Sequence, residues 1–272
     1  MQEFLTFFET MPAWQKLAWI FIVLSVSWIL EAGIPLVQLP YKKWKHTAVN
    51  MVFLASDLAI NLLVGIATVG IFTVQETTQF GLLYLVDWPR WLELLISILF
   101  LDFLAQYALH YYLHKVKWMW KLHMIHHSDT KVDATTGTRH HPGDYLLREV
   151  ASILGIIILG VPLAYYIFYR ILTILFTYFT HANINLPRWI DKPMSYIFVT
   201  PNAHKFHHHF ERPWTDTNFG NIFSIWDRLF GTFVYDDPKK IIYGLDVVDG
   251  RYDEDLKYQL KLPFNKNIKT DY

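Results

Sequence analysis

The sequence predicts an all-α integral membrane protein, a helical bundle of four to five spans with a cytoplasmic, histidine-rich helical cap. Hydrophobic residues make up 53% of the 272 residues and charged residues only 18%, a balance typical of membrane proteins. Some apolar runs exceed the ~20 residues that a helix needs to cross a bilayer. The 13 histidines gather near the ends of these runs. These three observations carry the prediction.

Composition also narrows the classes of function. The chain has 24 basic and 24 acidic residues, so a formal net charge of zero gives no electrostatic support for a nucleic-acid partner. It has no cysteine, which excludes disulfides, iron–sulfur clusters, thiolate metal sites and cysteine nucleophiles. Any tightly bound metal must therefore use nitrogen and oxygen ligands.

Residues 1–90 are expected to form N-terminal transmembrane helices. The first apolar run, residues 17–39, has Glu31 as its only charge, and three lysines follow it between positions 42 and 45. An excess of Lys and Arg marks the cytoplasmic end of a span. The N-terminus is therefore predicted to lie outside.

The second and third apolar runs carry polar side chains at helical spacing. Residues 48–74 contain Asp57 and Asn61, which are expected to face the bundle interior or water. In residues 91–113 and just beyond, polar side chains recur at i, i+4 steps and form a seam along one helix face. The seam consists of Asp102, Gln106, His110 and His114. Lysines follow it, so its histidines are predicted to emerge on the cytoplasmic side.

The next part of the chain is predicted to be a loop and a hairpin. Residues 128–144 are polar and are interpreted as a loop. Residues 145–180 are too long for one span and contain Gly160-Val161-Pro162, a turn signal that predicts two membrane segments. The second segment brings His181 to the face of the other histidines. Residues 246–272 are expected to be a polar C-terminal tail.

Two histidine clusters repeat the same spacing. H-x-x-H-H occurs first at positions 123 to 127 and again at 204 to 208. On a helix, histidines at i, i+3 and i+4 project from one face and can chelate metal. The nine candidate ligands are His110, His114, His123, His126, His127, His181, His204, His207 and His208. Nine imidazoles exceed the needs of one ion, so two ions are predicted, and zinc, copper, iron and nickel all suit neutral imidazole.

Four further histidines are not predicted to be ligands. His46 and His209 stand alone, and a lone histidine more often makes a hydrogen bond or lies at an interface. His140 and His141 lie in the polar loop and are left outside the ligand set. In the seam, Asp102 is expected to orient an imidazole by accepting its distal N–H group, although the seam can also be polarity used in bundle packing. Gln106 has the same two interpretations.

Two other classes of metal protein compete with this interpretation. A zinc protease requires the glutamate of H-E-x-x-H, but Tyr111, Tyr112 and Leu113 stand between the first two histidines. A non-catalytic metal-binding or metal-transporting membrane protein is the main alternative. A transport path, however, needs polar ligands near the bilayer midplane, whereas most of these histidines lie at or beyond the ends of the spans.

Three histidine boxes stand together with other motifs in this sequence. They are H-Y-Y-L-H, H-M-I-H-H and H-K-F-H-H, accompanied by T-T-G-T-R-H-H-P, H-A-N and D-T-N-F-G-N-I-F-S-I-W-D-R-L-F-G-T. The combination resembles the fatty acid hydroxylase and sterol desaturase superfamily over roughly residues 95–245, so residues 91–245 are assigned as the catalytic region. The resemblance implies a membrane-bound di-iron oxygenase. Such an enzyme uses O2 and external electrons to hydroxylate or desaturate a C–H bond of a lipid such as a fatty acyl chain or a sterol.

The resemblance also implies roles for single residues. The nine candidate ligands match the three boxes and a further histidine, here His181, that often precedes the last box. The residues expected beside the metal centre are Asp102, Gln106, His141, Asn218 and Asp227, with Trp226 as a packing neighbour. Asp227 is expected to hold an imidazole, or alternatively to pair with Arg228 or cap a helix. Arg139 is expected to meet a polar headgroup, either of the substrate or of a phospholipid.

The implied cofactors are two non-haem iron ions, with O2 as co-substrate. The implied partners are a lipid, the membrane and a separate electron-donor protein of the ferredoxin, rubredoxin or cytochrome type. The protein is expected to be a multi-pass membrane protein, in the inner membrane if the source is bacterial. Its histidine cluster and C-terminus are expected to be cytoplasmic. The particular lipid, and the choice between hydroxylation and desaturation, are not specified by the sequence.

Overall fold

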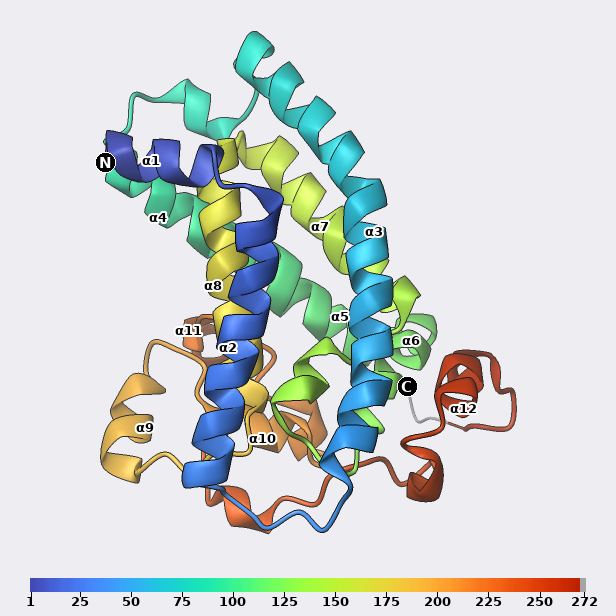
Figure 1. Cartoon of the computed structure of the whole chain (residues 1–272). Helices are drawn as coiled ribbons and strands as arrows, with labels where there is room; N and C mark the ends of the chain where they lie inside the picture. The colour runs from blue at the N-terminus through green and yellow to red at the C-terminus, as the bar shows by residue number, and fades with distance from the viewer. Residues whose placement is uncertain (270–272) are drawn as a thin grey trace.

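The described part of the chain, residues 1–269, is built from helices (Figure 1). These residues, given by a computed structural model, form isolated bridges but no β-strand. Within them, four helical stretches are long and apolar enough to cross a membrane. They are Ala13–Gly33, Lys43–Leu85, Arg90–Lys115 and Leu163–His181. The predicted all-α class is confirmed, and the number of candidate spans is at the lower predicted value.

The chain begins with two helices of different character. α1 (Gln2–Glu9) is short, was not predicted, and lies against α8 (Leu163–His181), where the Phe4 and Phe168 ring centroids are 5.0 Å apart. α2 (Ala13–Gly33) is the first candidate span and ends before the predicted residue 39. Beyond it the backbone pairs with the segment after α8, because the Leu36 N–H donates to the Asn183 carbonyl at 3.2 Å.

The second and third candidate spans run in opposite directions between the two ends of the molecule (Figure 1). α3 (Lys43–Thr78) is followed by the 3-10 helix Leu82–Leu85. The third stretch consists of α4 (Arg90–Leu101), a π-helix (Asp102–Ala108) and α5 (Leu109–Lys115). A π-helix takes more residues per turn than an α-helix, so an i, i+4 pattern does not stay on one face across it.

A hairpin of two helices follows, as predicted. α7 (Pro142–Leu159) and α8 are joined through Gly160, whose φ of +78° is a left-handed conformation that favours glycine. Pro162 then caps the start of α8. α7 carries Asp144, Arg148 and Glu149 in its first half, which explains why it is not one of the four candidate spans.

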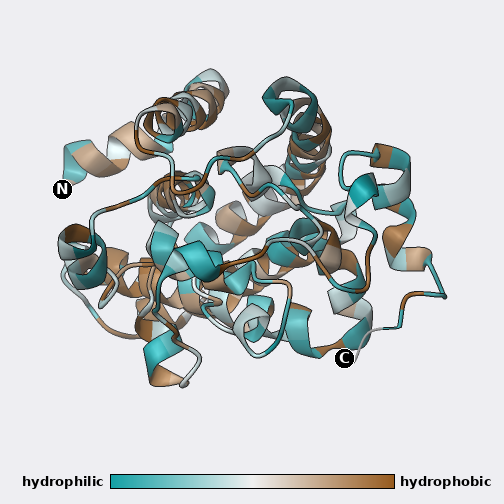
Figure 2. Ribbon diagram, turned by 90° about the horizontal axis from the view of Figure 1, so that it is seen from below, coloured by the Kyte–Doolittle hydropathy of each residue, from teal (hydrophilic) through white to brown (hydrophobic). Residues whose placement is uncertain are grey.

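The remaining segments form a cap at one end of the long helices, and we use this name for residues 116–141 and 182–269. Its α-helices are α6 (Lys117–His127), α9 (Arg188–Met194), α10 (Pro201–His207), α11 (Ile225–Leu229) and α12 (Leu256–Lys261). Its 3-10 helices are Ala134–Thr138, Trp214–Asp216, Pro238–Lys240, Gly250–Tyr252 and Leu262–Phe264. Figure 2, seen from the cap end, shows many hydrophilic residues there. The N-terminus lies at the opposite end (Figure 1).

Two parts of the cap are more ordered than the sequence predicted. Residues 128–144 are not an open loop, since Asp133 caps the 3-10 helix Ala134–Thr138 by accepting the Thr135 N–H at 2.8 Å. The described end of the polar tail folds back onto α6, where Leu262 is buried in the same hydrophobic cluster as Trp120. Both parts surround the histidine-bearing helices.

Glu31 connects α2 to the cap. Its side chain is buried, and one carboxylate oxygen accepts the N–H groups of Ala134 at 2.7 Å and Asn183 at 2.9 Å. Its other oxygen lies 2.7 Å from Lys43 Nζ at the start of α3. The only charge of the first apolar run therefore joins two spans to the segments on either side of the histidines.

Candidate metal centre

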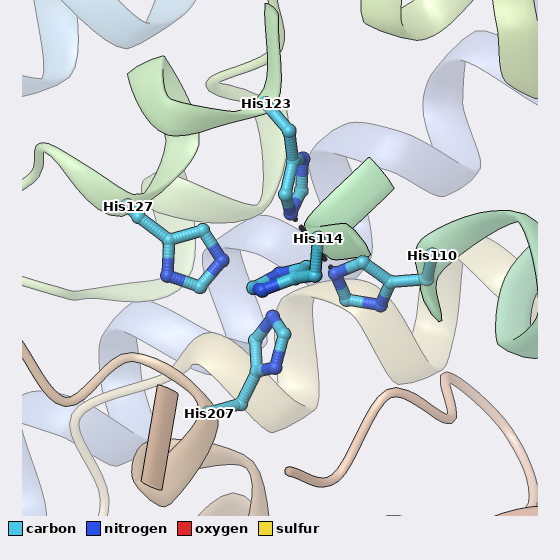
Figure 3. Close-up of side chains that lie close together, drawn as sticks. All are labelled: His110, His114, His123, His127 and His207. Carbon is cyan, nitrogen blue, oxygen red and sulfur yellow. Dashed lines mark hydrogen bonds between the residues drawn. The ribbon is translucent and has the colours of Figure 1, made fainter. Parts of the chain in front are cut away.

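All nine predicted ligands lie together in the interior, in two adjacent groups. The first group consists of His110, His114, His123, His127 and His207 (Figure 3). The second group consists of His126, His181, His204 and His208. Within each group, one nitrogen atom per ring lies within 4.8 Å of the others. Figure 3 shows the five rings of the first group pointing toward a common centre.

The repeated H-x-x-H-H spacing divides each box between the two groups. On α6, His123 and His127 face the first group, whereas His126 faces the second. The third box has the opposite division, since only its middle histidine, His207, joins the first group. The His126 and His127 ring centroids are 5.5 Å apart, so one short helix serves two neighbouring sites.

Backbone carbonyls fix the tautomer of three imidazoles. His110 Nδ1 lies 2.8 Å from the Phe219 carbonyl, His207 Nδ1 2.8 Å from that of Thr217, and His181 Nδ1 2.7 Å from that of Thr177. A carbonyl oxygen can only accept, so each Nδ1 must carry the proton. Each Nε2 is therefore left with a lone pair directed toward its group.

His123 is held by a carboxylate instead. Its Nδ1 lies 2.7 Å from Asp144, whose other oxygen accepts a hydrogen bond from Arg148 at 3.0 Å. Arg148 favours the ionised carboxylate, which in turn places the His123 proton on Nδ1. The Nε2 atoms of His110 and His123 then face each other at 3.0 Å with two lone pairs and no proton between them. A cation between the two atoms removes this repulsion.

Other imidazole nitrogens also have no hydrogen-bond partner. Among the described residues, no donor or acceptor meets either ring nitrogen of His127 or His208, although both side chains are buried. Burying a polar atom without a partner is costly, and a metal ion satisfies such a lone pair. His114 differs because its Nδ1 lies 3.4 Å from Asp216. The donor set therefore fits two metal ions bound by neutral imidazoles.

Burial keeps the cap imidazoles neutral. Desolvation, followed by the charge of neighbouring imidazoles, lowers the pKa of each ring well below its usual value of 6.5. This holds for His123, His126, His127, His204, His207 and His208. A neutral imidazole is the form that binds metal, so the site is prepared for ligation at neutral pH.

The seam on the third span does not act as predicted. Asp102 accepts the N–H groups of Ile222 and Phe223 and the indole N–H of Trp226 at 3.0 to 3.2 Å, and contacts no imidazole. Gln106 bonds to the Tyr169 hydroxyl and to Asn221. The π-helix that begins at Asp102 breaks the i, i+4 register on which the prediction rested. Gln106 still lines the cavity together with His110, but its hydrogen bonds go to Tyr169 and Asn221.

Asp227 and Asn218 act on the backbone of the cap. Asp227 accepts the N–H groups of Phe219 at 2.8 Å and Gly220 at 2.9 Å rather than an imidazole. It thereby positions the Phe219 carbonyl, which accepts a hydrogen bond from His110 Nδ1. Asn218 donates to the carbonyls of Ala203 and Val234. The prediction that Asp227 holds an imidazole is wrong, and Asp227 acts on His110 only indirectly, through the peptide groups of Phe219 and Gly220.

The two residues singled out in the loop before α7 differ in outcome: the prediction for Arg139 is wrong, whereas His141 lies outside both histidine groups, in line with its exclusion from the ligand set. Arg139 is fully buried and donates to the carbonyls of Ile125 and Asp253, so it is not placed to meet a headgroup. His141 caps α7 by accepting the Gly143 N–H at 3.0 Å and lies in neither histidine group. Arg139 thus supports α6 through the Ile125 carbonyl, and His141 supports the start of α7.

The other three histidines make ordinary contacts. His46 is buried between Asp129 and Asp133, 3.3 and 3.8 Å away. His209 accepts the N–H of Ile242 at 3.1 Å. His140 stacks on His126 with ring centroids 4.9 Å apart but belongs to neither group. The expected hydrogen-bonding role of His46 and His209 agrees with these contacts.

Two residues that hold the histidines were not predicted. Asp144 holds His123, and the only sequence signal is an acid two residues after the H-P pair. Lys205, inside the third box, donates to the Thr180 carbonyl at 3.2 Å and to that of His181. Its burial lowers the pKa of the ammonium group to about 7. Lys205 caps the end of α8 and so positions His181.

A cavity of about 170 Å³ adjoins the histidines on the side of the long helices. The histidines in its wall are His110, His126, His181 and His204, together with the nonligand His140. Apolar side chains such as Ile20, Leu54 and Leu58 line another part. The second group therefore supplies three of its four rings to the wall, and the first group supplies one.

Comparison with known proteins agrees with this site. The sequence model of the family described as fatty acid hydroxylase matches residues 94–232, which include all nine histidines. The chain is similar to the ornithine lipid hydroxylase OlsE of Rhizobium tropici, with 25% identity over 185 residues, 68% of this chain and 54% of that protein.

The chain is also similar to alkylglycerol monooxygenases. The Caenorhabditis elegans protein is 31% identical over 179 residues, 60% of this chain and 33% of its own length. The Homo sapiens protein is 29% identical over 153 residues, 55% and 32% of the two chains. The chain thus spans about a third to a half of these relatives, and no solved structure matches it. Since the family match covers half of the chain, the protein belongs to the fatty acid hydroxylase family.

Proposed function

We propose that the protein is a membrane-bound di-iron oxygenase that hydroxylates or desaturates a C–H bond of a lipid. The observation that carries the proposal is the pair of neutral imidazole groups beside a partly apolar cavity. The relatives named as lipid hydroxylase and monooxygenases support an oxygenase acting on a lipid. Ligand type alone suits several metals, and the family favours iron.

The reaction balances with an external reductant. Hydroxylation consumes the C–H compound, O2, two electrons and two protons, and yields the alcohol and water. Desaturation consumes the same reactants, removes two hydrogens from the lipid and yields two waters. The two iron ions, when bound, supply the redox chemistry that activates O2 against an unactivated C–H bond. The two electrons come from a separate donor of the ferredoxin, rubredoxin or cytochrome type.

The chain's own residues hold and shield the site. Carbonyls and Asp144 keep the Nδ1 protons in place, so that each Nε2 points inward. Asp227 and Lys205 position the segments that carry these contacts. The buried cap keeps bulk water away from the histidines, and the cavity brings a lipid beside them. Orientation, water exclusion and substrate placement are thus provided by identified residues.

We further propose that the cap is cytoplasmic and the N-terminus external. The histidine-bearing helix ends lie at the end opposite the N-terminus (Figure 1), and lysines cluster before α3 and around α6. In a bacterial cell, the membrane that the protein spans in this orientation is the inner membrane. A cytoplasmic cap faces the cell's soluble electron donors. Reporter tags after Tyr272 and before Met1 test the orientation, and a C-terminus outside would contradict it.

Metal analysis of the full chain, purified without oxygen in mild detergent, is the direct test. We expect two irons per chain, with the spectroscopic signature of a coupled pair that reacts with O2. Consumption of O2 should depend on both reductant and lipid. Zinc that cannot be exchanged for active iron would refute the proposal. Metal uptake into vesicles without O2 consumption would instead support the transport alternative.

A further inference from the structure

The cavity beside the second histidine group has a polar wall inside the bundle. Arg170 donates to Glu149 at 2.5 Å and to the Tyr145 hydroxyl at 2.9 Å. Asn61 also donates to that hydroxyl. Arg148 pairs with Asp144, which lies behind the wall. Each guanidinium therefore already has its own carboxylate.

Asp57 is the third carboxyl group of this region, and neither of these two arginines forms an ion pair with it. Its side chain lies in the second candidate span, is only 5% exposed and lines the cavity. No described residue donates a hydrogen bond to its Oδ1, and its Oδ2 is 3.9 Å from His140 Nδ1. A buried acceptor without a partner is costly, and an ionisable residue inside a span generally marks a functional site.

The position of Asp57 relates it to the candidate metal centre. Asp57 Oδ2 lies 3.9 Å from His140 Nδ1, the His140 ring stacks on His126 at 4.9 Å, and all three residues line the same cavity. The cavity is too small for a whole lipid, but its apolar wall at Ile20 and Leu54 allows a chain to continue from it. A group bound at Asp57 is therefore held a short distance from the histidines.

We propose that the substrate is a lipid whose polar group carries a hydroxyl or an amine, and that Asp57 accepts a hydrogen bond from it. This inference rests on the proposed function and names its substrate class. The oxidised carbon then lies near the polar group and not far along the chain. Lipids without a donor, such as plain hydrocarbons and fully capped headgroups, leave Asp57 unpaired and bind less well.

Binding of paired probes to the metal-loaded protein in detergent tests this inference. A long-chain alkylglycerol is compared with its di-O-methyl ether, and a long-chain alkylammonium with its trimethylammonium counterpart. Competition against one radiolabelled lipid measures the affinities. We expect the native protein to prefer the uncapped member of at least one pair about tenfold. The pair that shows the preference distinguishes hydroxyl from amine, and no preference in either pair overturns the proposal.

Variants at position 57 assign the preference to Asp57. Asp57→Leu has no acceptor and should abolish it, whereas Asp57→Asn keeps an acceptor oxygen and should retain part of it. Ser56→Ala is the matched control, because the Ser56 hydroxyl bonds to the Phe53 carbonyl of its own helix and does not line the cavity. An unchanged preference in Asp57→Leu, with the metal content of the control, would overturn the role of Asp57.

The same probes separate this inference from the proposed function. If the donor lipids bind selectively but no lipid is oxidised, the oxygenase proposal fails and Asp57 keeps its binding role. If capped and uncapped lipids are oxidised with equal efficiency, the oxygenase stands and the substrate class is wrong. Should Asp57→Leu not fold, Asp57→Asn and the probe pairs on the native protein still decide the outcome.

Discussion

The two histidine groups use the same ligand chemistry in different surroundings. In the first group, His114 packs against Trp120 and Phe219, with ring centroids 4.9 and 5.1 Å away, so the cap closes over the rings. In the second group, three of the four rings form part of the cavity wall. The comparison shows that the cap divides its work. The first group is the more shielded, with only His110 in the cavity wall, whereas the second group mostly faces the space where a substrate can bind.

Removing one ligand from each group should have the largest effect. His127→Ala affects the first group and His208→Ala the second, and neither ring makes a hydrogen bond to the described residues that would be lost as well. We expect each variant to lose the ion of its own group. Activity should fall by more than the ~100-fold that follows loss of a contact behind a ligand. Metal analysis and O2 consumption measure both effects.

His209→Ala is the matched control for this pair. His209 follows the third box directly but bonds to the Ile242 N–H and belongs to neither group. This variant should keep two ions. Full metal occupancy in His127→Ala or His208→Ala would mean that the two groups are not the metal sites.

Acidification should weaken the metal-free protein, and here both groups should respond alike. Burial lowers the pKa of His127 and His208 well below the value of about 6.5 expected in the unfolded chain. Below pH 6.5 the unfolded chain therefore binds protons that the native protein does not. The free energy of unfolding falls by up to about 1.4 kcal/mol per pH unit for each such proton.

Thermal unfolding of the metal-free protein in detergent checks this pH dependence. The midpoint should change little between pH 8 and pH 7 and fall steeply toward pH 5.5. His127→Gln and His208→Gln should each reduce the slope by a similar amount. A midpoint that rises on acidification would show that the native imidazoles are protonated.

Asp144→Asn should affect mainly the first group. Asp144 fixes the His123 proton on Nδ1, and loss of such a contact typically lowers metal affinity about 10- to 100-fold. Competition with a chelator measures the two dissociation constants. Asp191→Asn is the control, since Asp191 is a buried cap carboxylate that accepts from Thr200 and Tyr235. Equal weakening of both groups would contradict the separate support of the first.

Filling the cavity should give the smallest effect, and it should act on the side of the site to which the second group contributes three rings and the first group one. Thr173 lines the cavity and bonds to its own helix at Tyr169. Thr173→Phe should raise KM about tenfold without changing metal content. Thr73→Phe is the control, because Thr73 makes the same kind of bond on an exposed helix face. An unchanged KM in Thr173→Phe would mean that the lipid reaches the site by another route.

The nine histidines could be predicted because each box lies within one helix or at its end. Spacing at i, i+3 and i+4 is a local property, and it survives folding at His123, His126 and His127. Their division between two groups depends on where α5, α8 and α10 pack around α6. The sequence pattern of α6 carries no information about that packing. The set of histidines that gather in the interior was therefore predictable, whereas the group to which each histidine belongs was not.

The roles of the residues that support the histidines could not be predicted, for two physical reasons. Asp102 was placed by assuming a continuous α-helix, and the π-helix that starts at Asp102 breaks that register. The contacts that fix tautomers join residues far apart in the chain, such as His110 and Phe219, which are separated by 109 positions. Every residue also has a backbone carbonyl, so the sequence does not indicate which carbonyl accepts a hydrogen bond from a histidine. The hairpin at Gly160, by contrast, was predictable because its turn is encoded locally.

The buried Glu31 carboxylate has a consequence for how the protein is made. Its two backbone partners, Ala134 and Asn183, lie 103 and 152 residues further along the chain. During synthesis, α2 is therefore made long before either partner exists. Of the three partners of Glu31 in the folded protein, only Lys43, 12 residues away, is made soon after the helix. Closure of the cap is thus a late step of biogenesis, and the hydrogen bonds between α2 and the cap form only at that step.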